Sequence, residues 1–129
     1  MRARPRHRLA DLSGDRLPAL PGVYALWHDD APVYIGKARS LASRLGKAHR
    51  SRGVSMTNSA LRRNVAEHLG IATANEIKTG RPVTRAEANQ VNAWLDSCTA
   101  SWLTVDSEED ALQLEKTFKH EWLPPLTKI

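Results

Sequence analysis

One acidic side chain falls on a surface that the sequence predicts to be buried. From Ser107 onward the residues have helical periodicity, and at about 100° per residue one face is apolar. That face is formed by Ala111, Leu114, Phe118 and Trp122. Glu115 points in the same direction, and a carboxylate on a core-facing stripe is costly unless it is paired or binds a metal. The position therefore predicts either a buried ion pair or a catalytic or metal site.

Three further side chains could act on a charged substrate. Arg44 borders the apolar stripe of a helix expected over residues 37–49, where most arginines extend to the rim of the protein. Tyr24 and Tyr34 stand ten residues apart in two segments rich in β-forming residues, and a tyrosine in a strand usually packs against its neighbours. Each of the three, considered alone, fits a structural role at least as well as a chemical one.

The spacing of the tyrosines belongs to a longer pattern. Residues 22–24 are Gly-Val-Tyr and residues 34–36 are Tyr-Ile-Gly, and this pair resembles the two half-motifs of the GIY-YIG nuclease superfamily. The family carries an arginine eight residues after the second half-motif, which corresponds to Arg44. Its later helix carries a metal-binding glutamate, which corresponds to Glu115. The resemblance covers about residues 20–50 and 100–127.

The resemblance implies a metal-dependent endonuclease that hydrolyses phosphodiester bonds in nucleic acid, for which we expect DNA. Glu115 would bind Mg²⁺ or Mn²⁺, since Mg²⁺ is commonly held by one or two carboxylates with water and substrate phosphate. Arg44 would clamp the scissile phosphate with its planar fork of donors. Tyr24 is the first candidate to accept the proton of the attacking water, and Tyr34 is the second candidate or a phosphate contact. No small-molecule cofactor is expected.

Other residues complete the expected site. Lys37 could supply the positive charge that a phenol needs to act as a base near neutral pH. His49 is a possible helper, although a solvated histidine at a helix end is an equally good interpretation. Contacts with the substrate are expected from Gly36, Arg62, Arg63 and Thr127.

Thr127 is a departure from the family, which commonly has an asparagine at this position. Threonine keeps one hydroxyl but lacks the paired donor and acceptor of an amide. This difference motivates an alternative hypothesis, a nucleic-acid-binding module with impaired catalysis. A ribonuclease or toxin that uses the same residues is a further alternative.

Charge and composition agree with a polyanionic partner. Lys and Arg total 19 against 14 acids, which gives a net charge of +5, and basic proteins often bind nucleic acid.

The single cysteine, Cys98, cannot form an internal disulfide and fits a reducing compartment. No apolar run is long enough to span a membrane, so we expect a cytoplasmic protein without a membrane partner.

The elements expected around these residues form one α/β (α+β) domain. Strands are predicted over residues 22–27, 33–36 and 101–105, helices over 37–49 and 107–122, and a helical insert over about 54–99. The first two strands form an antiparallel hairpin because a short turn joins them. The predicted fold is therefore a three-stranded, mainly antiparallel sheet flanked by helices. Residues 1–20 are expected to be a basic arm that precedes a domain over residues 21–129.

Overall fold

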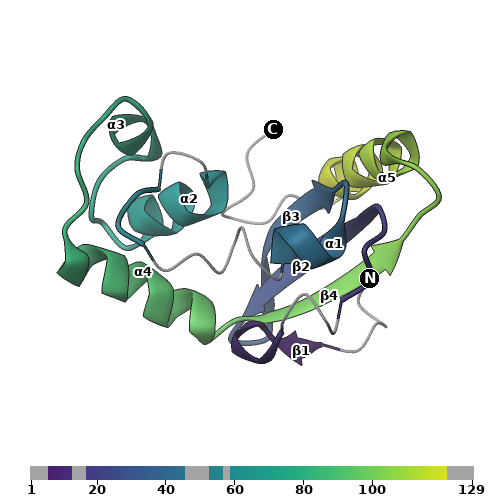
Figure 1. The fold of residues 1–129 in the computed structure, drawn as a ribbon, viewed down its shortest axis with the longest axis horizontal. Helices are drawn as coiled ribbons and strands as arrows, with labels where there is room; N and C mark the ends of the chain where they lie inside the picture. Colours follow the sequence, from purple (N-terminus) through teal and green to yellow (C-terminus); the bar gives the residue numbers. More distant parts are fainter. Residues whose placement is uncertain (1–5, 13–16, 46–52, 57–58, 122–129) are drawn as a thin grey trace.

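The computed structural model describes residues 6–12, 17–45, 53–56 and 59–121. The strands are β1 (His7–Arg8), β2 (Gly22–His28), β3 (Ala31–Ala38) and β4 (Thr99–Thr104). They form one antiparallel sheet in the order β1-β4-β2-β3 (Figure 1). The predicted antiparallel α/β architecture is confirmed, but within the described ranges the sheet has four strands where three were expected.

The extra strand comes from the segment that was expected to be an arm. In β1, His7 pairs with Ala100 and so extends the edge of β4. The Arg6 guanidinium lies 3.9 Å from the centroid of the Trp27 ring, and Leu9 and Leu12, which follow β1, are buried in the core. Residues 6–12 are thus part of the folded sheet and its core.

The hairpin of β2 and β3 is closed by a tight turn at Asp29 and Asp30. Both residues have positive φ, 50° and 66°, a conformation that two-residue hairpin turns require and that Asp tolerates better than most residues. The register pairs Tyr24 with Gly36 and Leu26 with Tyr34. Because side chains alternate between faces along a strand, both tyrosines lie on the same face of the sheet.

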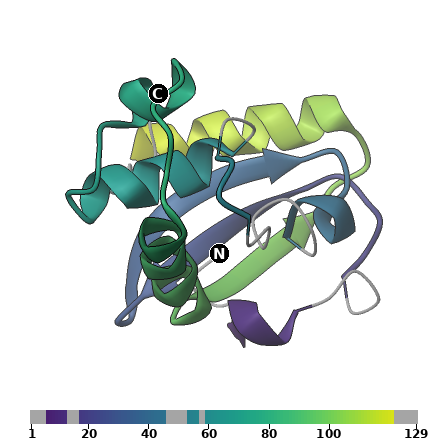
Figure 2. The same ribbon diagram turned by 60° about the vertical axis from the view of Figure 1, so that its left-hand side comes forward.

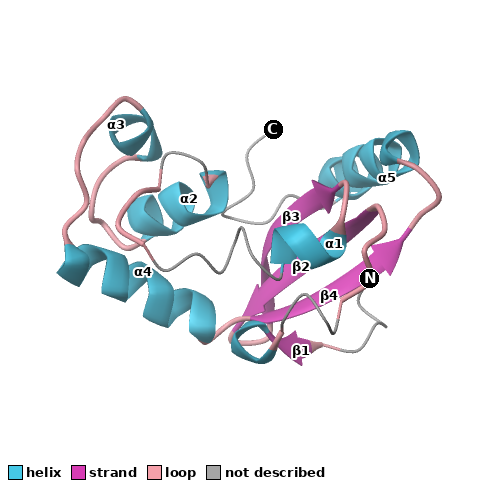
Figure 3. Ribbon diagram, in the orientation of Figure 1, coloured by secondary structure: helices cyan, strands magenta, loops and turns pink. Residues whose placement is uncertain are grey.

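The two faces of β2 pack into separate apolar clusters. Tyr24 and Leu26 belong to the larger cluster, which includes residues of the insert helices. Val23, Ala25 and Trp27 face the other way, toward α5 (Glu108–Glu121). The insert consists of α2 (Ala60–His68), α3 (Ala74–Lys78) and α4 (Arg85–Asp96). Figure 2 shows the insert helices and α5 around the sheet, and Figure 3 separates helices from strands by colour.

Local signals in the sequence explain where the insert helices begin and end. Thr84 and Glu87 form the capping box that the sequence predicts at the beginning of α4. Gly70, with φ of +77°, follows α2 at the predicted stop. None of the helices in the described ranges combines the length and apolar character needed to cross a membrane.

The first helix differs from the prediction at its start. Strand β3 continues through Ala38, and α1 (Leu41–Ser43) begins only after Ser40, whose hydroxyl caps it by accepting from the Ser43 N–H at 3.4 Å. Residues 46–49 of the predicted helix lie outside the described ranges. Leu41 packs over Gly22, where a Cβ would lie 2.7 Å from Leu41 Cδ1. The first motif glycine therefore lets α1 approach the sheet closely.

Arg62 has a structural environment that the sequence did not predict. Its side chain is fully buried, and its guanidinium donates to the carbonyls of Ser55 at 3.0 Å and Gly53 at 2.6 Å and to Asn92 Oδ1 at 3.2 Å. These bonds join α2 to α4 and to the segment before α2. The expected contact of Arg62 with substrate disagrees with this burial, because the apolar face of α2 turns the side chain inward.

Replacing Arg62 should therefore destabilise the fold. Arg62→Met keeps much of the side-chain volume but leaves the buried amide oxygen of Asn92 and the carbonyls of Ser55 and Gly53 without their donor. We expect the free energy of unfolding to fall by about 2 kcal/mol, measured by urea denaturation. Arg85→Met is the matched control: this residue is exposed at the beginning of α4, and its replacement should change stability by less than about 0.5 kcal/mol. Equal stability of the two variants would contradict the tethering role of Arg62.

Candidate active site

A cleft of about 250 Å³ lies where the hairpin, α2, α5 and Arg44, just past α1, come together. It gathers six of the residues expected at the site together with side chains from α2 and α5. Its lining consists of Tyr24, Tyr34, Ile35, Gly36, Lys37, Arg44, Ala60, Asn64, Glu115 and Lys119. Residues that are far apart in the sequence thus share one cavity, which contains an acid, three cations and two phenols.

The register of the hairpin positions the two phenols. The ring centroids of Tyr24 and Tyr34 are 6.1 Å apart, with an angle of 32° between the rings. The Tyr24 ring lies against the backbone of Gly36, where a Cβ would stand 2.5 Å from Tyr24 Cζ. Any larger residue at position 36 would have to displace that ring. The second motif glycine therefore makes room for the tyrosine of the first half-motif.

Burial and hydrogen bonding distinguish the two phenols. Burial raises the pKa of Tyr24 well above its usual value, and the nearby Tyr34 raises it further, while Arg44 lowers it. Burial also raises the pKa of Tyr34, but the hydrogen bond with Tyr24 and the charge of Arg44 act in the opposite direction. The bond raises the pKa of Tyr24 and lowers that of Tyr34, as expected when Tyr24 donates and Tyr34 accepts. Tyr34, which is also less buried, is therefore the phenol that loses its proton more readily.

Glu115 lies on the buried side of α5, as the helical periodicity predicts. Only 9% of the residue is exposed, and Ala111, Leu114 and Phe118 of the same helix pack against the sheet. Its Oε1 is 3.4 Å from the Nζ of Lys119, one turn later. The ion pair, one of the two alternatives considered for this carboxylate, is therefore present, and both of its residues line the cleft.

The donor set of the cleft fits a hard divalent cation. Among the described residues, no three His, Cys, Asp or Glu side chains gather as a metal cluster, so a cation here would depend on one carboxylate. Glu115 supplies that carboxylate, and the amide of Asn64 lines the same cleft. One or two carboxylates with water and substrate phosphate suffice for Mg²⁺. Glu115 is thus a suitable anchor for such an ion.

The remaining expected residues occupy different environments. Arg63 donates from Nη1 to the Met56 carbonyl at 3.0 Å, and its charge acts on Tyr34. His49 and Thr127 lie outside the described ranges. Sequence reasoning missed Asn64 and Lys119. The signal for Asn64 was an amide beside the apolar residues of α2, and the signal for Lys119 was its i,i+4 spacing from Glu115.

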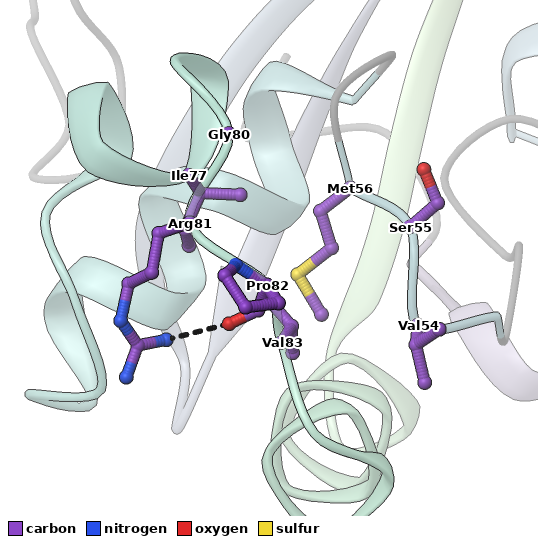
Figure 4. Close-up of a pocket in the computed structure, with 8 residues that line it drawn as sticks. All are labelled: Val54, Ser55, Met56, Ile77, Gly80, Arg81, Pro82 and Val83. Atoms are coloured by element: carbon purple, nitrogen blue, oxygen red, sulfur yellow. Dashed lines mark hydrogen bonds between the residues drawn. The ribbon is translucent and has the colours of Figure 1, made fainter.

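A second hollow, of about 220 Å³, lies within the insert, between α3 and the segment that precedes α2 (Figure 4). Its walls are mainly apolar, with Met56, Ile77 and Val83 among them. Arg81 is its charged residue, and the guanidinium donates to the Pro82 carbonyl at 3.2 Å. No acid lines this hollow among the described residues, so it offers no carboxylate to a metal ion.

Comparison with known proteins identifies a family. The family model of the GIY-YIG catalytic domain matches residues 23–128. Two similar solved structures are both of the GIY-YIG N-terminal endonuclease domain of UvrC from Thermotoga maritima. The magnesium-bound form is 21% identical, with 86% of each chain covered and a TM-score of 0.47. A point mutant bound to its catalytic divalent cation is 20% identical, with 88% of this chain and 89% of that chain covered and a TM-score of 0.50. No curated protein sequence matches the chain.

The two phenols should ionise at unusually high pH and in a fixed order. They are the only tyrosines of the sequence, so the ultraviolet phenolate signal is theirs alone. Since the folded pKa of each is raised, they contribute stability that is fully present below the unfolded pKa of about 10 and is lost as the pH rises through the folded values. We expect two steps above that pH, with Tyr34→Phe removing the earlier one. Ionisation of both phenols near pH 10 would contradict this electrostatic picture.

Proposed function

The chain belongs to the GIY-YIG endonuclease superfamily, and on that premise we propose that it hydrolyses phosphodiester bonds in DNA with the help of a divalent metal ion. One observation carries the proposal: Tyr24, Tyr34, Arg44 and Glu115 line a single cleft. A similar point mutant of the UvrC endonuclease domain is described as bound to its catalytic divalent cation, and this description is in keeping with a carboxylate at this place.

Glu115 is the proposed anchor of the metal ion, Mg²⁺ or Mn²⁺. When bound, such an ion polarises the phosphate and stabilises the negative charge of the leaving oxygen. The carboxylate is nearly buried and helix α5 fixes its position. Asn64 is proposed to orient water or substrate near it through its amide.

The cations of the cleft are proposed to bind the scissile phosphate. Lys37, Arg44 and Lys119 line the cleft and outnumber its one described acid. Arg44 is the proposed clamp, because a guanidinium can donate two parallel hydrogen bonds to a phosphate. Lys37 adds a point charge at the end of β3. Negative charge that develops on the nonbridging oxygens would then face fixed positive charge.

Tyr34, rather than Tyr24, is the proposed proton acceptor. Tyr34 is partly exposed in the cleft, whereas Tyr24 is 1% exposed, so water can reach Tyr34 more easily. The charge of Arg44 favours the Tyr34 phenolate, as does the hydrogen bond from Tyr24. Burial raises the pKa of Tyr34, so the step needs the Tyr34 phenolate, which a cation bound at Glu115 would favour further. The water oxygen would form its bond to phosphorus while its proton passes to the phenolate oxygen of Tyr34 and the bond to the leaving oxygen breaks. Tyr24 would hold Tyr34 in place.

Removal of the Glu115 charge should abolish cleavage without abolishing binding. We expect Glu115→Gln to reduce nicking of supercoiled plasmid in Mg²⁺ or Mn²⁺ by at least about 100-fold, and EDTA to stop the wild type. Glu109→Gln, on an exposed position of the same helix, is the matched control and should cut normally.

The same assay tests the alternatives. A wild type that shifts DNA on a gel but cuts neither DNA nor matched RNA in either metal would overturn the endonuclease and leave the binding module. Cleavage of RNA alone would identify a ribonuclease.

Lys119 should weaken metal binding, because its ammonium neutralises the carboxylate that the ion needs. Both side chains are largely buried, 22% and 11% exposed, so water screens the pair poorly. We expect Lys119→Met to raise the affinity for Mn²⁺ about fivefold, measured by electron paramagnetic resonance of the free ion. Lys116→Met changes an exposed lysine of the same helix and should have little effect. A weaker affinity in Lys119→Met would show that the lysine supports the metal site.

A further inference from the structure

A second polar cleft, of about 350 Å³, adjoins the first. It is lined by Lys37, Ala38, Arg39, Arg44, Glu108 and Ala111, and it shares Lys37 and Arg44 with the cleft of the tyrosines. These residues come from the end of β3, the region of α1 and the beginning of α5. Figure 2 shows the three elements together at one end of the sheet. The two clefts therefore form a continuous surface on either side of Lys37 and Arg44.

Small side chains keep the second cleft open. Ala38 and Ala111 are 3% and 1% exposed, so they form its closed side and project only a methyl group each. Among the residues that the structure describes, three cations, Lys37, Arg39 and Arg44, line the cleft with one acid, Glu108, which leaves a net charge of +2 from three positive charges and one negative. A cleft of this charge and polarity suits an anion.

The ion pair between Arg39 and Glu108 can give way easily to another anion. Arg39 contacts Glu108, but their side chains are 86% and 53% exposed, and exposed ion pairs contribute little stability. An incoming phosphate can therefore take the place of the Glu108 carboxylate at the Arg39 guanidinium. The planar fork of donors suits phosphate as well as carboxylate.

We propose that Lys37 and Arg39 form a second phosphate subsite, which holds the phosphate next to the scissile one on the same nucleic-acid strand. The inference rests on the proposed function, because it assumes that the first cleft takes the scissile phosphate. A polynucleotide carries a phosphate at every nucleotide, and Arg44 and Lys37 lie between the two clefts. The strand then runs from the tyrosine cleft past the end of β3 toward the beginning of α5.

Binding as a function of salt tests the subsite in the full chain. Duplex DNA is titrated in EDTA, which prevents cleavage, with wild type, Arg39→Ala and the control Arg85→Ala. We expect Arg39→Ala to bind about tenfold more weakly at low salt and to lower the slope of log K against log salt by about one, as loss of one phosphate contact requires. Arg85→Ala, at an exposed position of α4, should match the wild type. Glu108→Gln should bind more tightly because it removes the competing carboxylate.

Replacing single phosphates of the DNA with an uncharged analogue identifies the phosphate that Arg39 contacts. The cleavage position is mapped with wild type, and the neighbouring phosphate on each side is replaced in turn by methylphosphonate. We expect one of the two replacements to weaken binding by wild type and to have no further effect on Arg39→Ala. Additive losses at both positions would overturn the subsite.

The proposed function and the second phosphate subsite can be refuted separately. A wild type that neither binds nor cuts nucleic acid would remove the proposed function itself. A wild type that binds and cuts, with Arg39→Ala unchanged in affinity and salt slope, would remove only the subsite. The salt titration gives this answer whether or not cleavage is observed.

Discussion

The antiparallel register of β2 and β3 places Tyr24 opposite Gly36 and Tyr34 opposite Leu26, and the rest of the site is arranged around this pairing. Because side chains alternate along a strand, a shift of one residue between the two strands would place the two phenols on opposite faces of the sheet. The glycine opposite Tyr24 leaves space for its ring, and Gly22 leaves space for Leu41 of α1. The two motif glycines thus serve the close packing that brings Arg44 and the phenols to one cavity.

A second constraint is the burial of charge on α5. A carboxylate that is largely withdrawn from water is costly unless a cation neutralises it. Lys119 meets this requirement within the same helix, at 3.4 Å. The carboxylate is therefore held in place in the cleft that the phenols also line, and in the proposed function a divalent ion would take the place of the ammonium beside it.

The helical insert contributes to the site as well as to the core. Ala60 and Asn64 of α2 form part of the cleft wall. Arg62, between them, points into the protein and ties α2 to α4 and to the preceding segment. This tether fixes the wall that faces Glu115, so the insert and the sheet enclose the cavity together.

The sequence alone determined the features that depend on local periodicity and spacing. Local patterns within an element or between neighbouring elements predict the half-motifs, the hairpin, the capping box at Thr84 and the buried direction of Glu115.

Tertiary structure decided the features that depend on which surfaces meet. A two-residue strand such as β1 forms only because the edge of β4 is available, and no propensity in so short a segment could reveal it. The adjacent arginines of α2 have the same chemistry in sequence, yet packing buries Arg62 and leaves Arg63 near Tyr34. Asn64 and Lys119 reached the cleft for the same reason, because a helix fixes the relative directions of its side chains, whereas only its packing decides what those side chains face.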